Sequence, residues 1–486
     1  MSVLDESASA VSDAFLGFGN VLKEQRHIVN VKDYAIDGVV LEDSLLDALA
    51  EHDRVFIPRD VIIEVTNTIV LDPDKEIYGD GVLVAAPLRP AEWSMFRLTS
   101  LFDMRVVIDG VRIDGNLAEQ PAQPDGITSI DAIRIEGSAM GVRLNRIRFV
   151  DWRYGVTSPA NGLFRERISV TNCTFLGGYG AIGATSWKRS RITRNVCDGQ
   201  KHFGISIYNA RDTDVHFNEI KNTGRVGSAS AGISASTAQD CDIIGNRIHD
   251  VACHGVRLDT NAHRTRVSRN RMTNVGWVGG VIPPGSGSSC GVAAWEGAAG
   301  AYSIGVKIDH NILTTIAGYG ISAHYGLDDI YIGGNEISYV GDPGIACAAS
   351  GRIVANKVKN TDGPGIVLGW DDDNGNANQA HDQIVRLNDI GPVAMAGIHV
   401  NGAKRFSISN NSIHGAGTNA AATVQQRSGL YLAAAHPLSY LVTEDGVVHG
   451  NVIWGCDGYG IYDSAGPSVA VTNNVLTGNV EGEDWP

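Results

Sequence analysis

The chain has 486 residues, a hydrophobic content of 43%, and 58 glycines against 15 prolines, which suits many short strands joined by tight turns. Its formal net charge of −15 argues against a nucleic-acid partner, because phosphate binding requires clustered lysine and arginine. An acidic surface is compatible with neutral sugars or serves solubility alone. Because neither a signal peptide nor a membrane-spanning apolar run is recognisable, we expect a soluble protein made in a reducing cytoplasm.

The cysteines show no metal-binding or disulfide pattern. Seven cysteines include no Cys-x-x-Cys pair. Most of them lie in or beside apolar strand patterns and are expected to be buried free thiols that pack as small apolar side chains. These are Cys197, Cys241, Cys253, Cys290, Cys347 and Cys456.

In chain order, residues 1–50 are predicted to form an N-terminal segment with a capping helix at Glu42–Glu51, followed by a strand at Arg54–Arg59. Residues 51–480 are predicted to form a single solenoid, and residues 481–486 a loose acidic tail. A cap is expected physically, since the open end of a solenoid of strands exposes strand edges and an apolar interior.

Two short phrases in this region resemble the N-terminal cap of the pectin-lyase-like superfamily, as found in phage tailspikes and related polysaccharide-degrading proteins. The chain has Lys32-Asp33-Tyr34 and Ile57-Pro58 where that family has Val-x-Asp-Tyr/Phe-Gly-Ala and Val-x-Ile-Pro-x-Gly-x-Tyr. It departs from the family at Ala35-Ile36 and at Arg59-Asp60. The resemblance implies a right-handed parallel β-helix and a tailspike-like protein that assembles as a homotrimer.

From Asn195 to Asn474 one phrase recurs: an apolar residue, two further residues, Asn, one residue, and an apolar residue. Between the asparagines stands a glycine followed by alternating apolar residues, as in Gly255 to Asp259. The regular spacing is 9 residues from Asn to Gly and 14 from Gly to the next Asn, a unit of 23 residues. Repeats of this length with a period of two predict an all-β parallel β-helix with one coil per unit. The hexapeptides of left-handed β-helices and the Leu-x-x-Leu-x-Leu frame of leucine-rich repeats are both missing.

The recurring asparagine is expected at a bend of each coil. Asparagine tolerates the left-handed backbone conformation there, and stacked asparagine side chains can hydrogen bond from coil to coil.

Departures from the 23-residue unit gather next to the strands that begin with glycine. The extra residues number 12 after Asn270, 6 after Gly291, 9 after Gly365, 9 after Asn411 and 8 after Gly429. Insertions in a solenoid form loops, often on the binding face. We therefore expect these loops to wall the glycine-initiated sheet and make it a groove.

Within that sheet the second and fourth residues after each glycine are expected to point outward, because the first and third are apolar. Small residues at Ala346, Ala348 and Gly369 predict a floor with open space above it. Aromatic faces beside a polar groove suit stacking on sugar rings, although Trp295 and Trp370 can equally pack under their own loops. The candidate substrate-binding residues are Arg257, Trp295, His324, Tyr325, Trp370 and His399.

Carboxylates beside the groove are the candidate catalytic residues: Asp259, Glu296, Asp371 and Asp373. Glycoside hydrolysis requires two carboxyl groups about 5 Å apart for retention or about 6.5–9.5 Å apart for inversion, and Asp259 and Glu296 on successive coils fit either class. Glu296 is the candidate acid because Trp295 beside it supplies apolar contact, with one of Asp371 to Asp373 as its partner. No cofactor is expected, but Asp371, Asp372 and Asp373 alternatively form a Ca²⁺ site or a solvated turn.

A lyase is the second chemistry that these residues allow. His324 or Tyr325 would act as the base and Arg257 would bind a uronate carboxylate, although such a histidine is ordinarily a hydrogen-bonding surface residue. The sequence therefore favours a depolymerase, an endo-glycoside hydrolase on a bacterial surface polysaccharide or exopolysaccharide. The alternatives are a lyase on the same groove, a non-catalytic polysaccharide-binding spike and a structural fibre. We expect a virion-associated or otherwise extracellular homotrimer whose contacts include Trp454 and Phe406.

Overall fold

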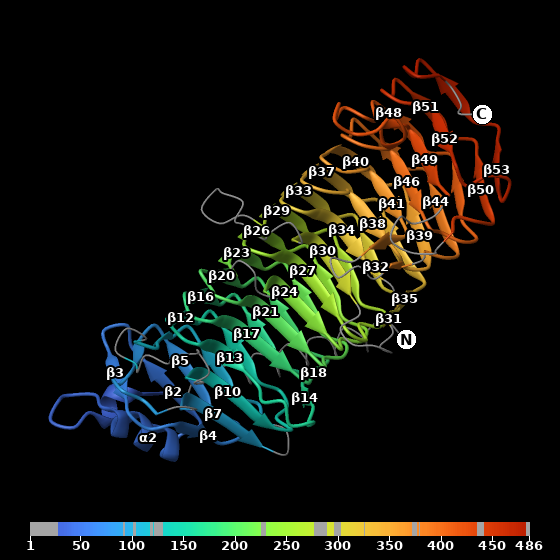
Figure 1. Cartoon of the computed structure of the whole chain (residues 1–486). Coiled ribbons are helices and arrows are strands. Elements are labelled where there is room, and N and C mark those ends of the chain that lie inside the picture. Colours follow the sequence, from blue (N-terminus) through green and yellow to red (C-terminus); the bar gives the residue numbers. More distant parts are fainter. Residues whose placement is uncertain are drawn as a thin grey trace, which may run out of the picture.

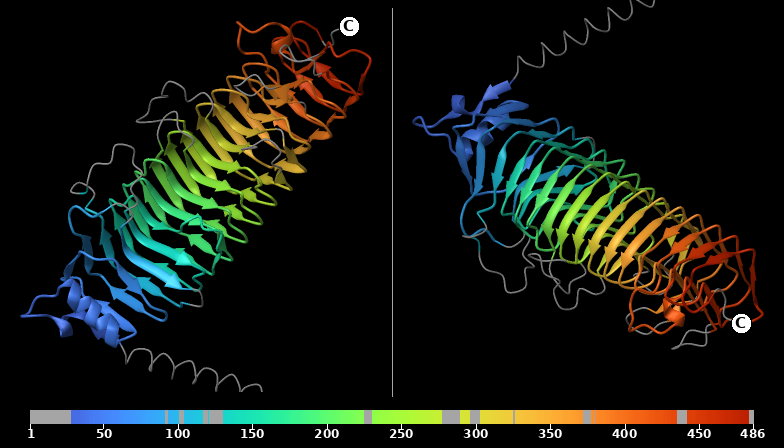
Figure 2. Two further views of the ribbon diagram at one scale, coloured as in Figure 1. Left: turned by 60° about the horizontal axis from the view of Figure 1, so that its bottom comes forward. Right: turned by 90° about the horizontal axis from the view of Figure 1, so that it is seen from above.

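A computed structural model describes residues 28–90, 93–100, 104–116, 120, 130–224, 230–276, 289–295, 303–324, 326–371, 377–378, 380–434 and 442–482. The molecule is an elongated solenoid in which strands stack coil upon coil along one axis (Figure 1). Three long sheets run its length, as the two further views also show (Figure 2). All strand pairs within them are parallel, which confirms the predicted β-helix.

Sheet I holds the strands that precede the asparagine bend. Its strands are β1 (Ile28–Asn30), β2 (Arg54–Ile57), β5 (Glu76–Gly79), β8 (Val107–Asp109), β11 (Arg143–Asn145), β15 (Ser169–Thr171), β19 (Arg191–Thr193), β22 (Asp214–His216), β25 (Asp242–Ile244), β28 (Arg266–Ser268), β32 (Lys307–Asp309), β36 (Ile330–Gly333), β39 (Gly351–Val354), β44 (Gln383–Arg386), β47 (Ser407–Ser409), β50 (Gly446–His449) and β53 (Val469–Thr472).

Sheet II follows the bend. Its strands are β3 (Ile62–Val65), β6 (Val82–Ala85), β9 (Arg112–Asp114), β12 (Arg148–Val150), β16 (Thr174–Leu176), β20 (Val196–Asp198), β23 (Glu219–Thr223), β26 (Arg247–Val251), β29 (Arg271–Val275), β33 (Ile312–Ile316), β37 (Glu336–Val340), β40 (Lys357–Thr361), β45 (Asp389–Ile390), β48 (Ser412–His414), β51 (Val452–Trp454) and β54 (Val475–Thr477).

Sheet III is the glycine-initiated sheet. Its strands are β4 (Ile69–Leu71), β7 (Ser94–Ser100), β10 (Asp131–Gly137), β13 (Tyr154–Thr157), β17 (Gly180–Thr185), β21 (Phe203–Tyr208), β24 (Ala231–Ser236), β27 (His254–Asp259), β30 (Cys290–Trp295), β34 (Tyr319–Ala323), β38 (Ile345–Cys347), β41 (Ile366–Leu368), β46 (Ile398–Asn401), β49 (Leu430–Ala433) and β52 (Ile461–Asp463). Three short pairs lie outside these sheets: β14 (Arg165–Glu166) with β18 (Trp187–Lys188), β31 (Ser303–Ile304) with β35 (Leu327–Asp328), and β42 (Trp370–Asp371) with β43 (Ala377–Asn378).

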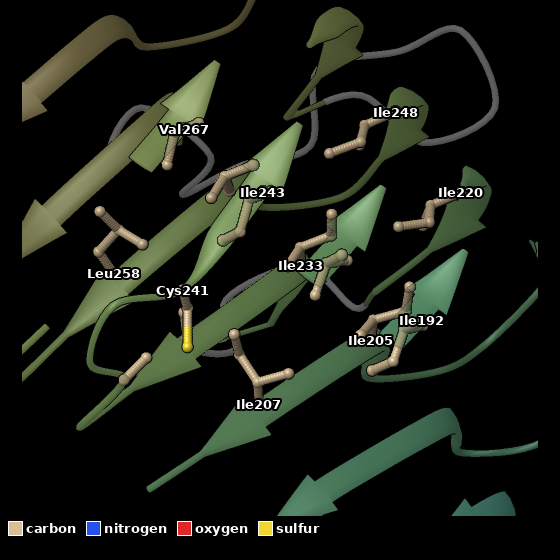
Figure 3. Packing of buried hydrophobic residues seen from close by; sticks show 14 of the residues in the cluster. Ile192, Ile205, Ile207, Ile220, Ile233, Cys241, Ile243, Ile248, Leu258 and Val267 are labelled. Carbon is tan, nitrogen blue, oxygen red and sulfur yellow. The ribbon is translucent and has the colours of Figure 1, made fainter. Parts of the chain in front are cut away.

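One continuous apolar core fills the solenoid, because every coil turns its alternate residues inward from all three sheets. In Figure 3, Ile233 of sheet III, Ile243 of sheet I and Ile248 of sheet II point into the same interior. The recurring glycine is required where sheet II passes into sheet III. A Cβ on Gly255 would lie 2.6 Å from both the carbonyl oxygen of Gly291 and the sulfur of Met272, so no side chain fits there.

The asparagines form an unbroken hydrogen-bonded ladder from Asn195 to Asn474, as expected from their spacing. The backbone N–H and the side-chain amide of Asn335 both donate to Oδ1 of Asn356, at 3.0 and 2.9 Å, and the amide also donates to the carbonyl of Ile308. The left-handed backbone lies one position earlier than expected. Asn335 follows Gly334 (φ 63°), and Asn311 follows His310 (φ 55°). The residue before the asparagine therefore adopts the left-handed conformation of the bend, and the asparagine contributes the side-chain amide that stacks from coil to coil.

A single α-helix within the described residues, α2 (Glu42–Glu51), lies at the N-terminal end of the solenoid (Figure 1). Its bounds agree with the sequence prediction. Leu45, Ala48 and Leu49 are buried in the core against the first coil. Two 3₁₀ turns, η1 (Val31–Tyr34) and η4 (Gln425–Arg427), complete the described helical structure. Because the helix has only 10 residues, it supplies a small cap.

The cysteines are free, as predicted, and all except the half-buried Cys253 are buried. Burial raises the pKa of the Cys241 thiol to about 12, so it stays protonated. Phe406 was expected to be exposed, but it is 3% exposed because its ring packs against Gly446 of the next coil, where a Cβ would overlap it. No helix in the described part of the chain is both long and apolar enough to cross a bilayer.

Candidate functional site

The outward face of sheet III carries the candidate site. In β27 the side chains of Val256 and Leu258 are buried in the core, whereas Arg257 and Asp259 face outward, as the alternation predicts. The residue before each glycine also contributes to this face, since His254 packs against Trp295 of the next coil. Each coil therefore presents up to three outward side chains.

Arg257, Asp259 and Trp295 are in contact at the centre of this face. Asp259 and Trp295 are register partners on the adjacent strands β27 and β30. Nε of Arg257 lies 2.8 Å from a carboxylate oxygen of Asp259, and its guanidinium lies 5.1 Å from the centre of the Trp295 ring. Burial raises the pKa of Asp259 despite the opposing charge of Arg257. The carboxyl group is thereby shifted toward the range of a general acid.

His254 lies beneath Trp295. It is 2% exposed, and its ring meets the indole edge to face with centres 4.8 Å apart. Burial, with smaller contributions from Arg257 and His324, lowers the pKa of His254 to about 3. The backbone N–H of Cys290 donates to Nδ1 at 3.3 Å, so the proton of the neutral ring is on Nε2. The histidine is therefore an uncharged support for the tryptophan.

His324 extends the cluster by one coil, with its ring centre 5.3 Å from that of Trp295. Several buried polar atoms on this face have no hydrogen-bond partner among the described residues. They are Oδ1 of Asp259, Nε1 of Trp295, Oγ of Ser322 and Oδ1 of Asn401. Native proteins rarely leave such atoms unsatisfied, so a bound water or a polar ligand that reaches them would complete their hydrogen bonds.

The open floor expected at the small residues is not present. Ala346 and Ala348 are 0% and 2% exposed. Ala346 belongs to a second apolar cluster, outside the solenoid, with Cys290, Ala293 and Tyr319, and Trp295 packs against it. Because the alanine side chains are small, the large aromatic rings of neighbouring coils can pack flat against the sheet. The open space expected above the small residues is therefore occupied by other side chains of the protein.

His399 lies in a separate aromatic group toward the C-terminus. Its ring stacks on Tyr431 of the next coil, with centres 4.6 Å apart and planes 11° apart, and Tyr431 meets Tyr462 at 5.6 Å. These three residues share one register position on β46, β49 and β52. They form a half-buried aromatic row on the outward face of sheet III.

The other predicted residues are not placed in the cluster. Glu296, Tyr325, Asp372 and Asp373 lie outside the described residues, so the predicted Ca²⁺ site lies partly outside them too. The same holds for most of the predicted walls, including 277–288, 296–302, 372–376 and 435–441. Trp370 and Asp371 form β42, which pairs antiparallel with β43 and does not join sheet III.

The position before the glycine, which holds Tyr154, His254 and Tyr319 in different coils, was not predicted from the sequence to face outward; Asp131, followed by Ala132, shares this register on β10. Strict alternation would turn this position inward. The burial pattern of β27 shows three consecutive buried residues at its start, so the alternation is broken at the glycine. The recurrence of polar and aromatic residues directly before that glycine was the available signal.

A group with metal-ligand chemistry lies on sheet I. Asp214, His216 and Asp242 place one ligand atom each within 4.8 Å of one another. All three side chains are half-exposed, and Asp214 and Asp242 are register partners on β22 and β25. They offer two carboxylates and an imidazole, a donor set that zinc and similar ions accept.

Comparisons with known proteins support the fold. Residues 131–308 match the family model described as "Right handed beta helix region". Among solved structures, the pre-mature gene product 12 of bacteriophage phi29 is 12% identical over 93% of this chain and 64% of that chain, with a TM-score of 0.57. The A-module of an Azotobacter vinelandii mannuronan C-5 epimerase is 13% identical over 94% and 99%, with a TM-score of 0.45. The Dettilon tailspike protein is 13% identical over 85% and 69%, with a TM-score of 0.43.

No curated protein matches the chain by sequence. Identities this low show the fold alone. The chain is a right-handed parallel β-helix, as its repeat predicts.

Proposed function

We propose that this protein is a polysaccharide depolymerase that binds its substrate along the outward face of sheet III. The row of buried polar atoms without partners on this face, from Asp259 to Asn401, carries the proposal. A polysaccharide supplies hydroxyl groups at regular intervals, and successive strands are about 4.8 Å apart, so one extended chain can satisfy several coils. The half-buried aromatic rings of Trp295, Tyr431 and Tyr462 supply apolar faces for sugar rings.

The hydrolysis is assigned to Asp259 and Glu296. Asp259 ends β27, and Glu296 follows Trp295, the register partner of Asp259, in the chain. The raised pKa of Asp259 suits an acid that protonates the glycosidic oxygen, with Glu296 as the second carboxylate. Asp371 and Asp373 are the other proposed partners, since both follow strand β41 of sheet III in the chain.

A lyase is the second candidate, and the position of Arg257 favours it. A guanidinium against the Trp295 ring would bind the carboxylate of a uronate stacked there, and His324 on the next coil would remove the neighbouring proton. Tyr325, the residue after His324, is the alternative base. In this reaction the base takes the proton from C5 of the uronate, the C4–O glycosidic bond breaks and the leaving oxygen takes up a proton. A double bond forms between C4 and C5, so the product is an unsaturated sugar and no water is consumed.

The experiment is incubation of the protein with a panel of purified bacterial capsular, lipopolysaccharide and exopolysaccharide preparations. New reducing ends without ultraviolet absorbance indicate a hydrolase, and both signals together indicate a lyase. Retained binding without either signal indicates a polysaccharide-binding spike. Neither cleavage nor binding of any member of the panel would contradict the proposal.

The same proposal includes a tailspike-like role: a virion-associated or otherwise extracellular homotrimer. The exposed apolar residues of the C-terminal coils support an assembly. They are Val447, Val452, Trp454 and Val475, which are 38–57% exposed.

A further inference from the structure

A pocket of about 420 Å³ opens on sheet I, a different sheet from the proposed substrate-binding face. Its lining comes from four successive coils and is rich in cations: Arg266, Lys307 and Arg352, with Asp309, Asp329 and Tyr331. Arg266, Lys307, Tyr331 and Arg352 are register partners on β28, β32, β36 and β39. The parallel register therefore places their side chains in one row on the outward face.

Of the three cations in this pocket, Arg266 alone is in an ion pair with a carboxylate of the described residues. Arg266 donates to both oxygens of Asp309, at 3.2 and 2.8 Å. Burial is the largest single influence and works to raise the pKa of Asp309, but the hydrogen bonds from Arg266 and Ser268 and the nearby positive charge of Arg266 and His310 together hold the pKa below its usual value. Lys307 and Arg352 are exposed, and neither is in an ion pair with a carboxylate of the described residues. With Asp329 on the rim, three cations face two carboxylates.

Tyr331 gives the pocket a flat floor. Gly333, two residues later in β36, has no side chain, and a Cβ there would overlap the Tyr331 ring. The ring therefore lies flat along the strand instead of standing out from it. Lys307 and Arg352 flank Tyr331 on the neighbouring coils, one coil to either side. An aromatic plane with a cation at each end matches a sugar ring that carries anionic groups.

We propose that this pocket is a second, non-catalytic binding site for an anionic saccharide, with one sugar ring on Tyr331 and its carboxylate or sulfate on Lys307 and Arg352. Arg266 is locked by Asp309 and shapes the wall. The net acidic charge of the chain would repel a polyanion, and the cationic row offsets that repulsion at this pocket. The site is independent of the chemistry on sheet III.

The test is calorimetric titration with an oligomer of glucuronic acid and with the same oligomer after reduction of its carboxylates to alcohols. All proteins also carry Arg257→Ala, which removes the cation of the sheet III cluster. We expect the acidic oligomer to bind more tightly than the reduced one, and less tightly as salt is raised. The double change Lys307→Ala with Arg352→Ala should weaken binding of the acidic oligomer by about tenfold or more, as loss of charge-assisted hydrogen bonds does. Tyr331→Ala should weaken binding of both oligomers.

Arg143→Ala is the matched control, because Arg143 occupies the same register row on β11, is exposed and lies away from the pocket. In the Arg257→Ala background, Arg143→Ala should bind the acidic oligomer as tightly as the parent protein, which carries Arg257→Ala alone. Thermal melts that agree with the parent exclude misfolding of the exposed-residue variants. Equal affinity of the parent and the double variant, or equal affinity for the two oligomers, would overturn the proposal. Absence of polysaccharide cleavage by the wild-type protein, with this binding intact, would instead count against the proposed function on sheet III.

Discussion

Asp259 and Trp295 stand opposite each other at the ends of two adjacent parallel strands, and Arg257 contacts both. The pairing brings a buried carboxyl group, a cation and an aromatic face together on one side of the solenoid. Each of the three comes from an outward position of the same sheet, so the rigid ladder fixes their relative placement. Substitutions in this cluster should therefore lower activity, whereas substitutions in the asparagine ladder should lower only stability.

Replacing Asp259 by Asn should lower polysaccharide turnover by a factor of about 10² to 10⁴, as loss of a general acid does, because the amide cannot donate a proton to the leaving oxygen. Initial rates on the polysaccharide identified by the panel are the measurement, with binding retained. Asp212→Asn is the control, since Asp212 is an exposed carboxylate with a left-handed backbone that asparagine tolerates. A wild-type rate for Asp259→Asn would move the chemistry to other residues.

Glu296→Gln should reduce the rate by a similar factor with substrate still bound, since hydrolysis needs both carboxyl groups. If Asp371 or Asp373 is the partner instead, replacing Asp371, Asp372 and Asp373 together by Asn will abolish turnover while Glu296→Gln retains it. Parallel rate measurements on the two variants separate these assignments. Unchanged rates in both would reject all three aspartates and the glutamate.

Replacing Asn335 by Ala should cost about 1–3 kcal/mol of unfolding free energy, because buried partners in neighbouring coils lose their hydrogen bonds. The backbone N–H of Asn311 and the carbonyl of Ile308 are the groups left without it. Denaturant titration measures the loss. Asn474→Ala, at the half-exposed end of the ladder, should cost less. A larger cost at Asn474 than at Asn335 would contradict the ladder account.

Asp131 should make the protein less stable as the pH rises from about 4 to about 7. Burial raises the pKa of Asp131 to about 7, although Arg134 and Arg153 oppose the shift. The folded state therefore holds a proton that the unfolded chain releases near its normal pKa of about 4. This contribution to stability is full below that value and is lost as the pH rises through the folded pKa. Denaturant titrations at pH 5 and pH 8 should show a smaller decrease for Asp131→Asn than for wild type, and equal decreases would disprove the assignment.

The proposed trimer should scatter light at three times the 51.6 kDa mass of the chain over a wide concentration range. Trp454 is 38% exposed; its ring stacks on that of His414 with centres 5.0 Å apart, and its exposed surface lies next to Val452 on the same strand. Replacing Val452 and Val475 by Asp should shift the scattering mass toward that of one chain without unfolding it. A monomer mass for the wild type at all concentrations would exclude the assembly.

The repeat made the fold predictable, because the 23-residue unit, the buried asparagines and the capping helix all follow from local patterns. The site was predictable only in part. Alternation placed Arg257, Asp259, Trp295 and His324 on one face. It failed at His254 because the close approach of Gly255 to Gly291 breaks the period of two. The surface at Ala346 is covered by aromatic rings from other coils, and the residue pattern of a single strand does not reveal such contacts.

Binding of polysaccharide to the outward face of sheet III is tested by the affinity of Trp295→Ala for the cleaved or bound polysaccharide. Trp454→Ala is the matched control, because Trp454 is a tryptophan on sheet II, 38% exposed and not part of the proposed binding face. Trp295→Ala should bind at least about tenfold more weakly than wild type, because a half-buried aromatic contact is lost, with an unchanged circular dichroism spectrum. Trp454→Ala should bind as wild type does. Wild-type affinity in Trp295→Ala would show that polysaccharide does not bind this face.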